Sequence, residues 1–429
     1  MKKMKRFSKY FFLVALGLLV LAGGSLGFAA PTEINFYMWE DPTYQAIVDA
    51  FNSSQKEVYV KTNLVPTSVY ETKIMTLLAG GADIDCYMQK RQVDMFMQYK
   101  NGFIEPLNKY LKNSNYNLKS IEPYKAQVTI KGKLVAIPFR GAGYYTYYNK
   151  KLFEKAGIPT PNQYVKEGAW NWKKFAEVTK KLSSGDGKQY GALLFTWPQF
   201  SLFPVIQENT YFISAEGKVK FDEKAMTRSI KMRRDLERNK AIMSMAQMKA
   251  TNTQYAKAFY DGNIGMIIMG EWFPGMMLGG RDNNLLRNFT WDDWGITRMP
   301  CDSSKYINVG ASTFNHVYSR SKKKEAAFKF ISWMGSVEGS KIVARNGFLP
   351  PVNNEETKKE LAKVIPDSES LNYFLESAPR VPLWYTQYGS QVSATLNSQL
   401  ERYLASDMTE QVFIKEVKER FNQIVESNR

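Results

Sequence analysis

The chain has 429 residues, of which 44% are hydrophobic, so it is long enough for two or more domains with ordinary cores and is neither a disordered nor a fibrous sequence. Its formal net charge is +17. The basic residues are spread along amphipathic helices, as at Lys322–Lys324 and at Lys415 and Lys418, so we interpret them as solvated helix faces and do not expect nucleic acid as a partner.

The N-terminal segment has the pattern of a secretory signal. An apolar run from Phe11 to Ala22 follows a basic stretch and is too short for a membrane-spanning helix. We expect cleavage after Ala29 or Ala30, which leaves 53 basic against 41 acidic residues in the mature chain. Gly24 stands where a lipoprotein would carry its cysteine. This predicts a soluble exported protein, periplasmic or extracellular, with tethering by a retained signal helix as the alternative.

Strand and helix patterns alternate at the start of the mature chain. Strand patterns occupy residues 33–39, 58–65 and 84–88, and helical patterns begin after the first two of them, at Asp41-Pro42 and at Ser68. This alternation predicts a parallel sheet covered on both faces, with ligands bound at the carboxyl ends of its strands.

The middle of the chain repeats these patterns around a tyrosine-rich stretch. We expect a strand at Leu134–Phe139 that Pro138 stops, an extended run through Tyr144–Tyr148 and a helical turn closed by Gly157. Further strands are expected at 190–195, 264–269, 296–299 and 309–317, and helices at 175–182, 225–239, 252–260, 323–334 and 410–425.

One long segment resembles a known family. Residues 131–158, KGKLVAIPFRGAGYYTYYNKKLFEKAGI, are similar to the hinge-crossing signature of the family 1 extracellular solute-binding proteins of ABC sugar importers, which include the maltose-binding proteins. Four further stretches, at 170–175, 258–266, 294–300 and 321–351, agree with family motifs in order and spacing. The resemblance covers nearly the whole mature chain.

The resemblance implies an α/β, two-lobe periplasmic-binding-protein fold of type II-like architecture. Each lobe is expected to hold a mixed, mostly parallel sheet flanked by helices, with a hinged cleft between the lobes. It implies a signal peptide at 1–30, a first lobe from 31–140 and 292–363, and a second lobe from 141–291 and 364–429.

The function implied is capture of a carbohydrate, a mono- or oligosaccharide with a uronic acid as one option, by hinge closure and its delivery to the membrane permease of an ABC importer. We expect a monomer without cofactor or catalytic activity. Binding of a non-sugar solute such as a glycerol phosphodiester, and coupling to a chemoreceptor, remain alternatives. A carbohydrate-active enzyme is a remote one, because two carboxylates across one bond can arise by chance among 41 acidic residues.

Candidate ligand-binding residues are aromatic and polar side chains near strand ends, since sugar rings offer apolar faces and a rim of hydroxyls. The resemblance implies stacking by Tyr87, Trp272 and Trp384. Two departures, Leu194 and Ala142, replace an aromatic platform and a hinge acid of maltose-binding relatives. The full predicted set is Trp39, Glu40, Tyr87, Lys90, Arg91, Arg140, Phe195, Trp197, Trp272, Trp384 and Tyr385.

Lys90, Arg91 and Arg140 would suit a uronate carboxylate if they face the cleft, and would otherwise form salt bridges or a solvated rim. His316 is the single histidine and we expect a structural role for it, with no metal site. Cys86 and Cys301 leave a disulfide open.

Overall fold

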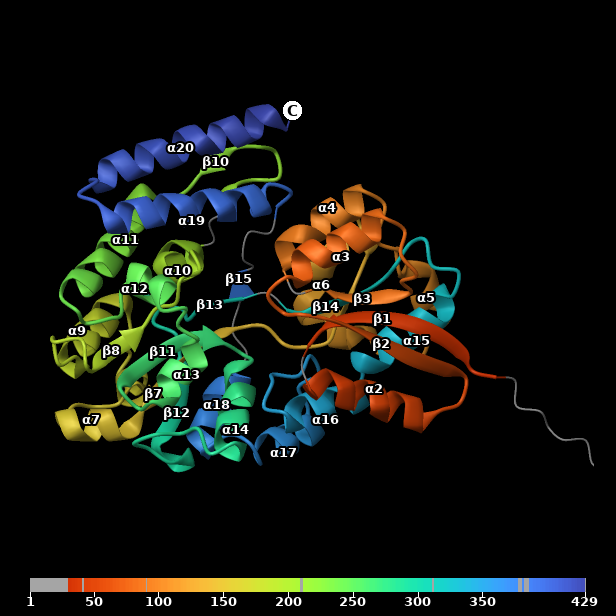
Figure 1. Ribbon diagram of the computed structural model, residues 1–429, viewed down its shortest axis with the longest axis horizontal. Coiled ribbons are helices and arrows are strands. Elements are labelled where there is room, and N and C mark those ends of the chain that lie inside the picture. The colour runs from red at the N-terminus through yellow and green to blue at the C-terminus, as the bar shows by residue number, and fades with distance from the viewer. Residues whose placement is uncertain are drawn as a thin grey trace, which may run out of the picture.

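The computed structural model describes residues 30–428, apart from Asp41, Lys90, Ala311 and the stretches 209–210, 377–379 and 382–385. The predicted signal peptide lies outside the described residues except for its last residue, Ala30. Figure 1 shows two lobes side by side, joined by thin connections. No helix in the described ranges is both long enough and apolar enough to cross a membrane.

The first lobe is built on a five-stranded sheet of order β2-β1-β3-β14-β6. β1 pairs in parallel with β2 and β3, and β14 pairs antiparallel with β3 and β6. In β1, the alternating residues Ile34, Phe36 and Met38 are fully buried, as a strand with one buried face predicts. The first-lobe elements are β1 (Thr32–Trp39), α2 (Pro42–Ser54), β2 (Val58–Val65), α3 (Tyr70–Ala79), β3 (Cys86–Gln89), η1 (Gln92–Asp94), α4 (Met95–Lys100), α5 (Asn108–Lys112), η2 (Leu118–Tyr124), α6 (Lys125–Val128), β4 (Thr129–Ile130), β5 (Lys133–Leu134), β6 (Ile137–Pro138), β14 (Phe314–Val317), α15 (Lys324–Met334) and α16 (Val337–Arg345).

The second lobe is built on a four-stranded sheet of order β12-β7-β11-β8. β7 pairs antiparallel with β11 and β12, and β8 pairs in parallel with β11. Both sheets are therefore mixed, as predicted, with a larger antiparallel share than expected. The second-lobe elements are β7 (Tyr144–Asn149), α7 (Lys150–Ala156), α8 (Pro161–Lys166), α9 (Trp172–Leu182), β8 (Tyr190–Leu193), α10 (Gln199–Gln207), β9 (Phe212–Ile213), β10 (Val219–Lys220), α11 (Glu223–Arg238), α12 (Met245–Ala250), α13 (Tyr255–Tyr260), β11 (Ile264–Gly270), α14 (Phe273–Asp282), η3 (Trp291–Asp293), β12 (Trp294–Arg298), β13 (Asn308–Val309), α17 (Glu355–Leu361), α18 (Ser368–Leu375), β15 (Arg380–Val381), α19 (Gly389–Ala405) and α20 (Glu410–Ser427).

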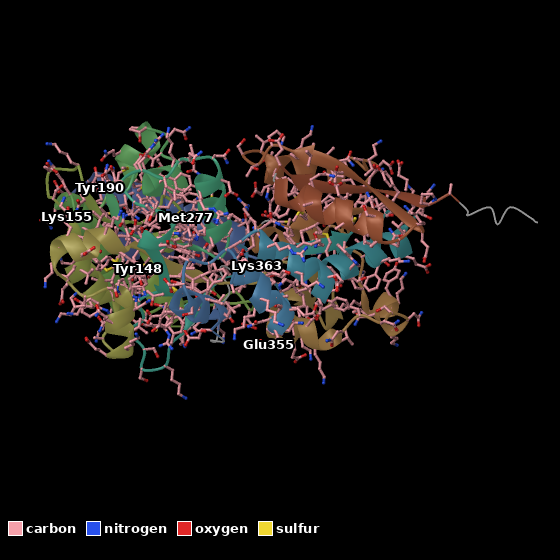
Figure 2. The ribbon with its side chains drawn as sticks, turned by 90° about the horizontal axis from the view of Figure 1, so that it is seen from below. Tyr148, Lys155, Tyr190, Met277, Glu355 and Lys363 are labelled. Carbon is pink, nitrogen blue, oxygen red and sulfur yellow. The ribbon has the colours of Figure 1, made fainter. Side chains whose placement is uncertain are left out.

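The lobe boundaries differ from the predicted ones in two places. Residues 294–298, expected in the first lobe, form β12 in the second sheet, where Ile296 lies opposite Tyr147 of β7. Leu361 of α17, also expected in the first lobe, belongs to the core of the second. The reason is that the buried run in β12 specifies a covered strand without specifying its partner, and β7 offers an open edge for it. Figure 2 gives a second view, with Tyr148 and Tyr190 in the second lobe and Glu355 and Lys363 beside the junction.

The chain crosses between the lobes three times, near residues 139–143, 310–313 and 346–354, and these crossings pack backbone to backbone. A Cβ atom on Gly310 would lie 2.6 Å from the backbone nitrogen of Gly143 in the first crossing. The Gly141 N–H donates to the carbonyl of Leu349 in the third crossing at 2.6 Å. Side chains at these glycines would push the crossings apart, so the close approach of the backbones requires glycine at these positions.

The two cysteines are free in the structure. Cys86 is buried in β3 of the first lobe, and burial raises the pKa of its thiol well above the usual value. Cys301 follows β12 in the second lobe and is partly exposed. Because β12 belongs to the second sheet, the two cysteines lie in different lobes, and no disulfide joins them in the structure.

Candidate functional site

An aromatic cluster lies in the second lobe where β8 and β11 end. Phe195 and Trp197 follow β8, Trp272 follows β11, and Tyr255 opens α13. The ring centroids of Phe195 and Tyr255 are 5.0 Å apart, and those of Trp197 and Trp272 are 6.2 Å apart. All four side chains are partly exposed, unlike the core rings around them. The cluster thus offers several apolar ring faces in one place, which suits the C–H face of a sugar.

Trp272 lies at the junction of the two lobes, because its side chain packs against the cores of both. Its indole N–H donates to the hydroxyl of Tyr255 at 3.0 Å, and this contact fixes the ring orientation. Gly270 makes room for the ring, since a Cβ atom there would lie 2.0 Å from Cζ3 of Trp272. The Trp272 ring, predicted to stack on the ligand, is therefore oriented by a hydrogen bond to Tyr255 and fits into the space left by the absent side chain of Gly270.

Arg140 and Glu271 form an ion pair between the lobes. Nε of Arg140, at the end of the first lobe, lies 3.5 Å from Oε1 of Glu271, which follows β11. The guanidinium also donates to Oγ1 of Thr313 at 2.9 Å, and Oε2 of Glu271 accepts from the backbone N–H of Leu349 at 3.3 Å. Burial raises the pKa of Glu271 to about 7, against the opposing effects of Arg140 and of the Leu349 hydrogen bond.

Trp39 and Glu40 stand at the end of β1, and the structure treats them differently. Trp39 is 5% exposed and its ring lies edge-on to Tyr44 and Tyr70, with the Arg140 guanidinium carbon 5.9 Å from its centroid. Trp39 therefore packs beside Arg140 and exposes little of its ring to a ligand. Glu40 is exposed, with its N–H donating to the carbonyl of Val65, so its carboxylate can meet hydroxyl groups.

Tyr87 does not fit the stacking role predicted for it. Its ring is 0% exposed, its hydroxyl donates to Oε1 of Gln98 at 3.0 Å, and it lies 5.3 Å from the ring of His316. The reason is that β3 runs between β1 and β14, so its side chains point into faces that helices cover. We leave Tyr87 out of the proposed site.

Of the predicted basic residues, Arg140 lies at the lobe junction and Arg91 lies in a surface salt bridge. Arg91 is exposed, and its guanidinium is held by both carboxylate oxygens of Asp94, at 2.8 and 3.0 Å, which fits the salt-bridge alternative. Lys90, Trp384 and Tyr385 lie outside the described residues and stay predictions.

Sequence reasoning missed Tyr255 and assigned no role to Glu271. Tyr255 opens an ordinary amphipathic helix, so its pattern gave no signal. Glu271 did have a sequence signal. It stands between Gly270 and Trp272, directly after a buried strand, and the aromatic candidates were found at such positions. The two departures noted from maltose-binding relatives, Leu194 and Ala142, are both fully buried.

Other features of the described residues are structural. His316 is buried, its Nδ1 lies 2.7 Å from the carbonyl oxygen of Val135, and burial lowers its pKa to about 4. In the described part of the chain, no group of three His, Cys, Asp or Glu side chains is arranged to hold a metal ion.

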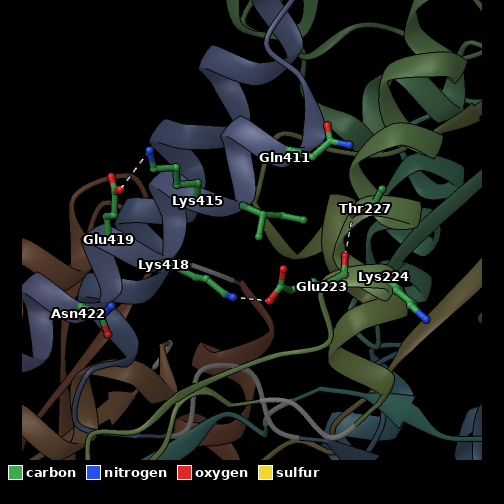
Figure 3. Close-up of a pocket in the computed structure, with 9 residues that line it drawn as sticks. Glu223, Lys224, Thr227, Gln411, Lys415, Lys418, Glu419 and Asn422 are labelled. Atoms are coloured by element: carbon green, nitrogen blue, oxygen red, sulfur yellow. Dashed lines mark hydrogen bonds and ion pairs between the residues drawn. The ribbon is translucent and has the colours of Figure 1, made fainter.

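Figure 3 shows a cavity of about 450 Å³ between α11 and α20, away from the aromatic cluster. An ion pair between Lys418 and Glu223 spans it, and Lys415 pairs with Glu419 at its rim. Its lining is mostly charged and includes none of the aromatic cluster, so we do not assign the ligand to it. The lining residues are Glu223, Lys224, Thr227, Gln411, Ile414, Lys415, Lys418, Glu419 and Asn422.

Two sheet-based lobes joined by three crossings define the fold of a two-lobe solute-binding protein. The chain belongs to the bacterial extracellular solute-binding protein family, whose model matches residues 46–365. This is a family of binding proteins.

Individual relatives cover nearly the whole chain. A Brucella abortus protein named as a binding protein is 25% identical over 392 residues, which are 87% of this chain and 88% of that one. A sugar transporter of Rhizobium etli, solved in an open conformation, is 25% identical with a TM-score of 0.76 and covers 91% of this chain and 99% of its own. An ABC substrate-binding protein of Listeria monocytogenes, solved in complex with cycloalternan, is 23% identical with a TM-score of 0.74, and covers 92% of this chain and 98% of its own.

Proposed function

We propose that this chain is the exported solute-binding component of an ABC importer and that it captures a carbohydrate between its lobes. The observation that carries the proposal is the aromatic cluster of Phe195, Trp197, Tyr255 and Trp272, whose last member packs against both lobes. A ligand stacked on Trp272 would contact both lobes and would stabilise the form in which they are closed.

The choice of a carbohydrate rests on the chemistry of the site and on the relatives. Partly exposed rings beside a buried ion pair match a ligand with apolar ring faces and a hydroxyl rim, and we include the exposed acid Glu40, at the end of β1, as a partner for hydroxyl groups. The Rhizobium relative is a sugar transporter, and the Listeria relative was solved in complex with cycloalternan. Trp39, Arg140 and the undescribed Lys90, Trp384 and Tyr385 complete the proposed site.

The partner we propose is the membrane permease of the importer, which would recognise the closed pair of lobes. The signal-like segment at residues 1–30 would direct export, and the absence of a lipobox cysteine at Gly24 favours a free protein over a lipid-anchored one. We propose that the chain acts as a monomer and without a cofactor.

The test is isothermal titration of the mature chain, from Pro31 onward, against neutral and uronic mono- and oligosaccharides, with each sugar analysed afterwards. One-to-one binding of an intact sugar is the expected result. Chemical turnover of the sugar would show an enzyme instead. Absence of binding to every sugar tested would contradict the carbohydrate assignment.

Trp272→Ala tests the site itself. Because the ring supplies a contact to both lobes, its loss should weaken binding by about 2 kcal/mol or more, roughly thirtyfold. The matched control is Trp333→Ala, which removes a partly buried indole that packs on Phe51 in the first-lobe core. Equal affinity of Trp272→Ala and the unmodified chain would remove Trp272 from the site.

A further inference from the structure

Glu271 contacts three segments at the lobe junction, two through its carboxylate and one through its backbone N–H. It follows β11 of the second lobe, its side chain is 3% exposed, and its two oxygens face different partners. Oε1 faces Arg140 of the first lobe, and Oε2 accepts from the N–H of Leu349 in the third crossing. Its own backbone N–H donates to the carbonyl of Gly143, in the first crossing, at 3.0 Å. The position of this carboxylate is therefore set by contacts on several sides.

The cation that Glu271 faces lies in aromatic surroundings. The guanidinium carbon of Arg140 lies 5.0 to 5.9 Å from the ring centroids of Phe348, Phe139, Tyr44 and Trp39. A buried charge in such surroundings is costly without a counter-charge, and Glu271 supplies one.

The Arg140–Glu271 pair adjoins the aromatic cluster, because Glu271 directly precedes Trp272 in the chain and Trp272 is hydrogen-bonded to Tyr255. Tyr255, which accepts the hydrogen bond from Trp272, has its pKa raised to about 12 by burial, and the nearby Arg140 opposes that rise. A ligand stacked on the cluster would thus lie within the field of the Arg140–Glu271 pair.

We propose that Glu271 determines the charge of the sugar that the site accepts: as the internal counter-ion of Arg140 it selects neutral carbohydrates over uronates. The inference rests on the proposed function. A guanidinium without this partner would offer charge-assisted hydrogen bonds to a uronate carboxylate. With Glu271 in place, that carboxylate would meet a like charge in a desolvated site, which disfavours binding.

The surroundings of Glu271 make this selection depend on pH. The charge of Glu271 contributes to the raised pKa values of the buried phenols Tyr144 and Tyr147, which lie well above the usual value mainly because of burial, so both phenols stay neutral beside it. Glu271 itself, with its pKa raised to about 7 by burial, gains protons as the pH falls from 8 to 6. Uronates stay ionised throughout this range, since free carboxyl groups titrate near pH 4.

The experiment uses matched sugar pairs that differ only in a carboxylate: D-glucose with D-glucuronate, D-galactose with D-galacturonate, and their disaccharides. Each is titrated calorimetrically into the mature chain and into Glu271→Gln at pH 8 and pH 6. For the unmodified chain at pH 8 we expect the neutral member to bind about tenfold or more tightly than the uronate, and this ratio to fall at pH 6. For Glu271→Gln we expect the uronate to gain at least about tenfold relative to the neutral sugar, at both pH values, with a gain that added salt reduces.

The control variant is Glu416→Gln, which removes the acid of another Arg–Glu pair, with Arg402, within the second lobe. It should leave the neutral-to-uronate ratio unchanged. Should Glu271→Gln fail to fold, as judged by circular dichroism, the pH dependence of the unmodified chain decides. A ratio independent of pH in that chain, or a ratio unmoved in a folded Glu271→Gln, overturns the inference while neutral sugar binding keeps the proposed function intact. If the unmodified chain binds none of the sugars, both the proposed function and the inference are overturned.

Discussion

Trp272 owes its position to the residue two places before it. β11 ends at Gly270, and the six-membered part of the Trp272 indole lies over the space that a Gly270 side chain would fill. A single methyl group there would collide with the ring, while the strand itself cannot move because β7 and β8 hold it on both sides. The ring would have to turn out of its place.

Gly270→Ala should therefore weaken sugar binding nearly as much as Trp272→Ala and cost about 1–3 kcal/mol of unfolding free energy from the overpacked contact. Titration calorimetry and urea unfolding measure the two effects. Gly279→Ala is the matched control, because Gly279 lies in α14 with no atom within 4 Å of the added Cβ, and it should leave affinity unchanged. Full affinity in Gly270→Ala would show that the ring position does not matter for binding.

At the scale of elements, α11 supports the aromatic cluster from behind. It carries Arg233, whose side chain is fully buried, into the second lobe, where Nε binds Oε1 of Glu237 at 2.6 Å. Nη1 donates to the carbonyl of Phe195 at 3.2 Å, so the helix holds the segment that presents Phe195 and Trp197. The helix begins at Glu223 and is capped by Asp222, whose carboxylate accepts a hydrogen bond from the N–H of Ala225.

Arg233→Met should lower the unfolding free energy by about 3–5 kcal/mol, because it leaves the Glu237 carboxylate buried without its counter-ion. Chemical unfolding measures the loss. Arg238→Met on the same helix is the control, since Arg238 pairs with Asp407 at the exposed surface and should cost about 0–1 kcal/mol. Similar losses in the two variants would mean that burial of the Arg233 pair contributes nothing.

At the scale of the whole molecule, the lobes meet at a second place besides the crossings. Val93, in the short η1 helix of the first lobe, is 8% exposed and belongs to the hydrophobic core of the second lobe. η1 lies against α19, whose first turn follows the segment with the predicted Trp384 and Tyr385. Opening of the lobes would expose Val93, so this contact favours the closed form.

Val93→Ser should shift the molecule toward open forms, because it removes apolar contact and would bury a hydroxyl. We expect about 1–2 kcal/mol less stabilisation of the closed form and a sugar affinity weakened about 5–30-fold. Calorimetry gives the affinity, and small-angle X-ray scattering should show a larger radius of gyration without ligand. The control is Val69→Ser at an exposed first-lobe site. Unchanged affinity and scattering in Val93→Ser would show that the η1 contact has no part in closure.

Much of the architecture could be predicted from local patterns. The alternation of Ile34, Phe36 and Met38 predicted β1, and Gly157, at φ 63°, ends α7 as expected of a helix stop. Partner choice could not be predicted in this way. The pattern of β12 shows a buried strand equally well for either sheet, so it could not correct the first-lobe assignment that the family resemblance implied for residues 294–298, and the structure pairs them with β7. Leu361 was misplaced too, because helix periodicity does not state which core the apolar side faces.

The sequence alone determined the elements, the two-lobe family and the aromatic character of the site, because these follow from periodicity and from motifs carried by neighbouring residues. Only the tertiary structure decided which aromatic rings remain accessible. Both Tyr87 and Trp272 were expected at the ends of buried strands, yet Tyr87 lies within β3, between central strands, and Trp272 follows β11 at the junction of the two lobes. It also brought Arg140 and Glu271 together across 131 positions of sequence. Exposure and long-range pairing depend on how whole elements pack, which no local pattern contains.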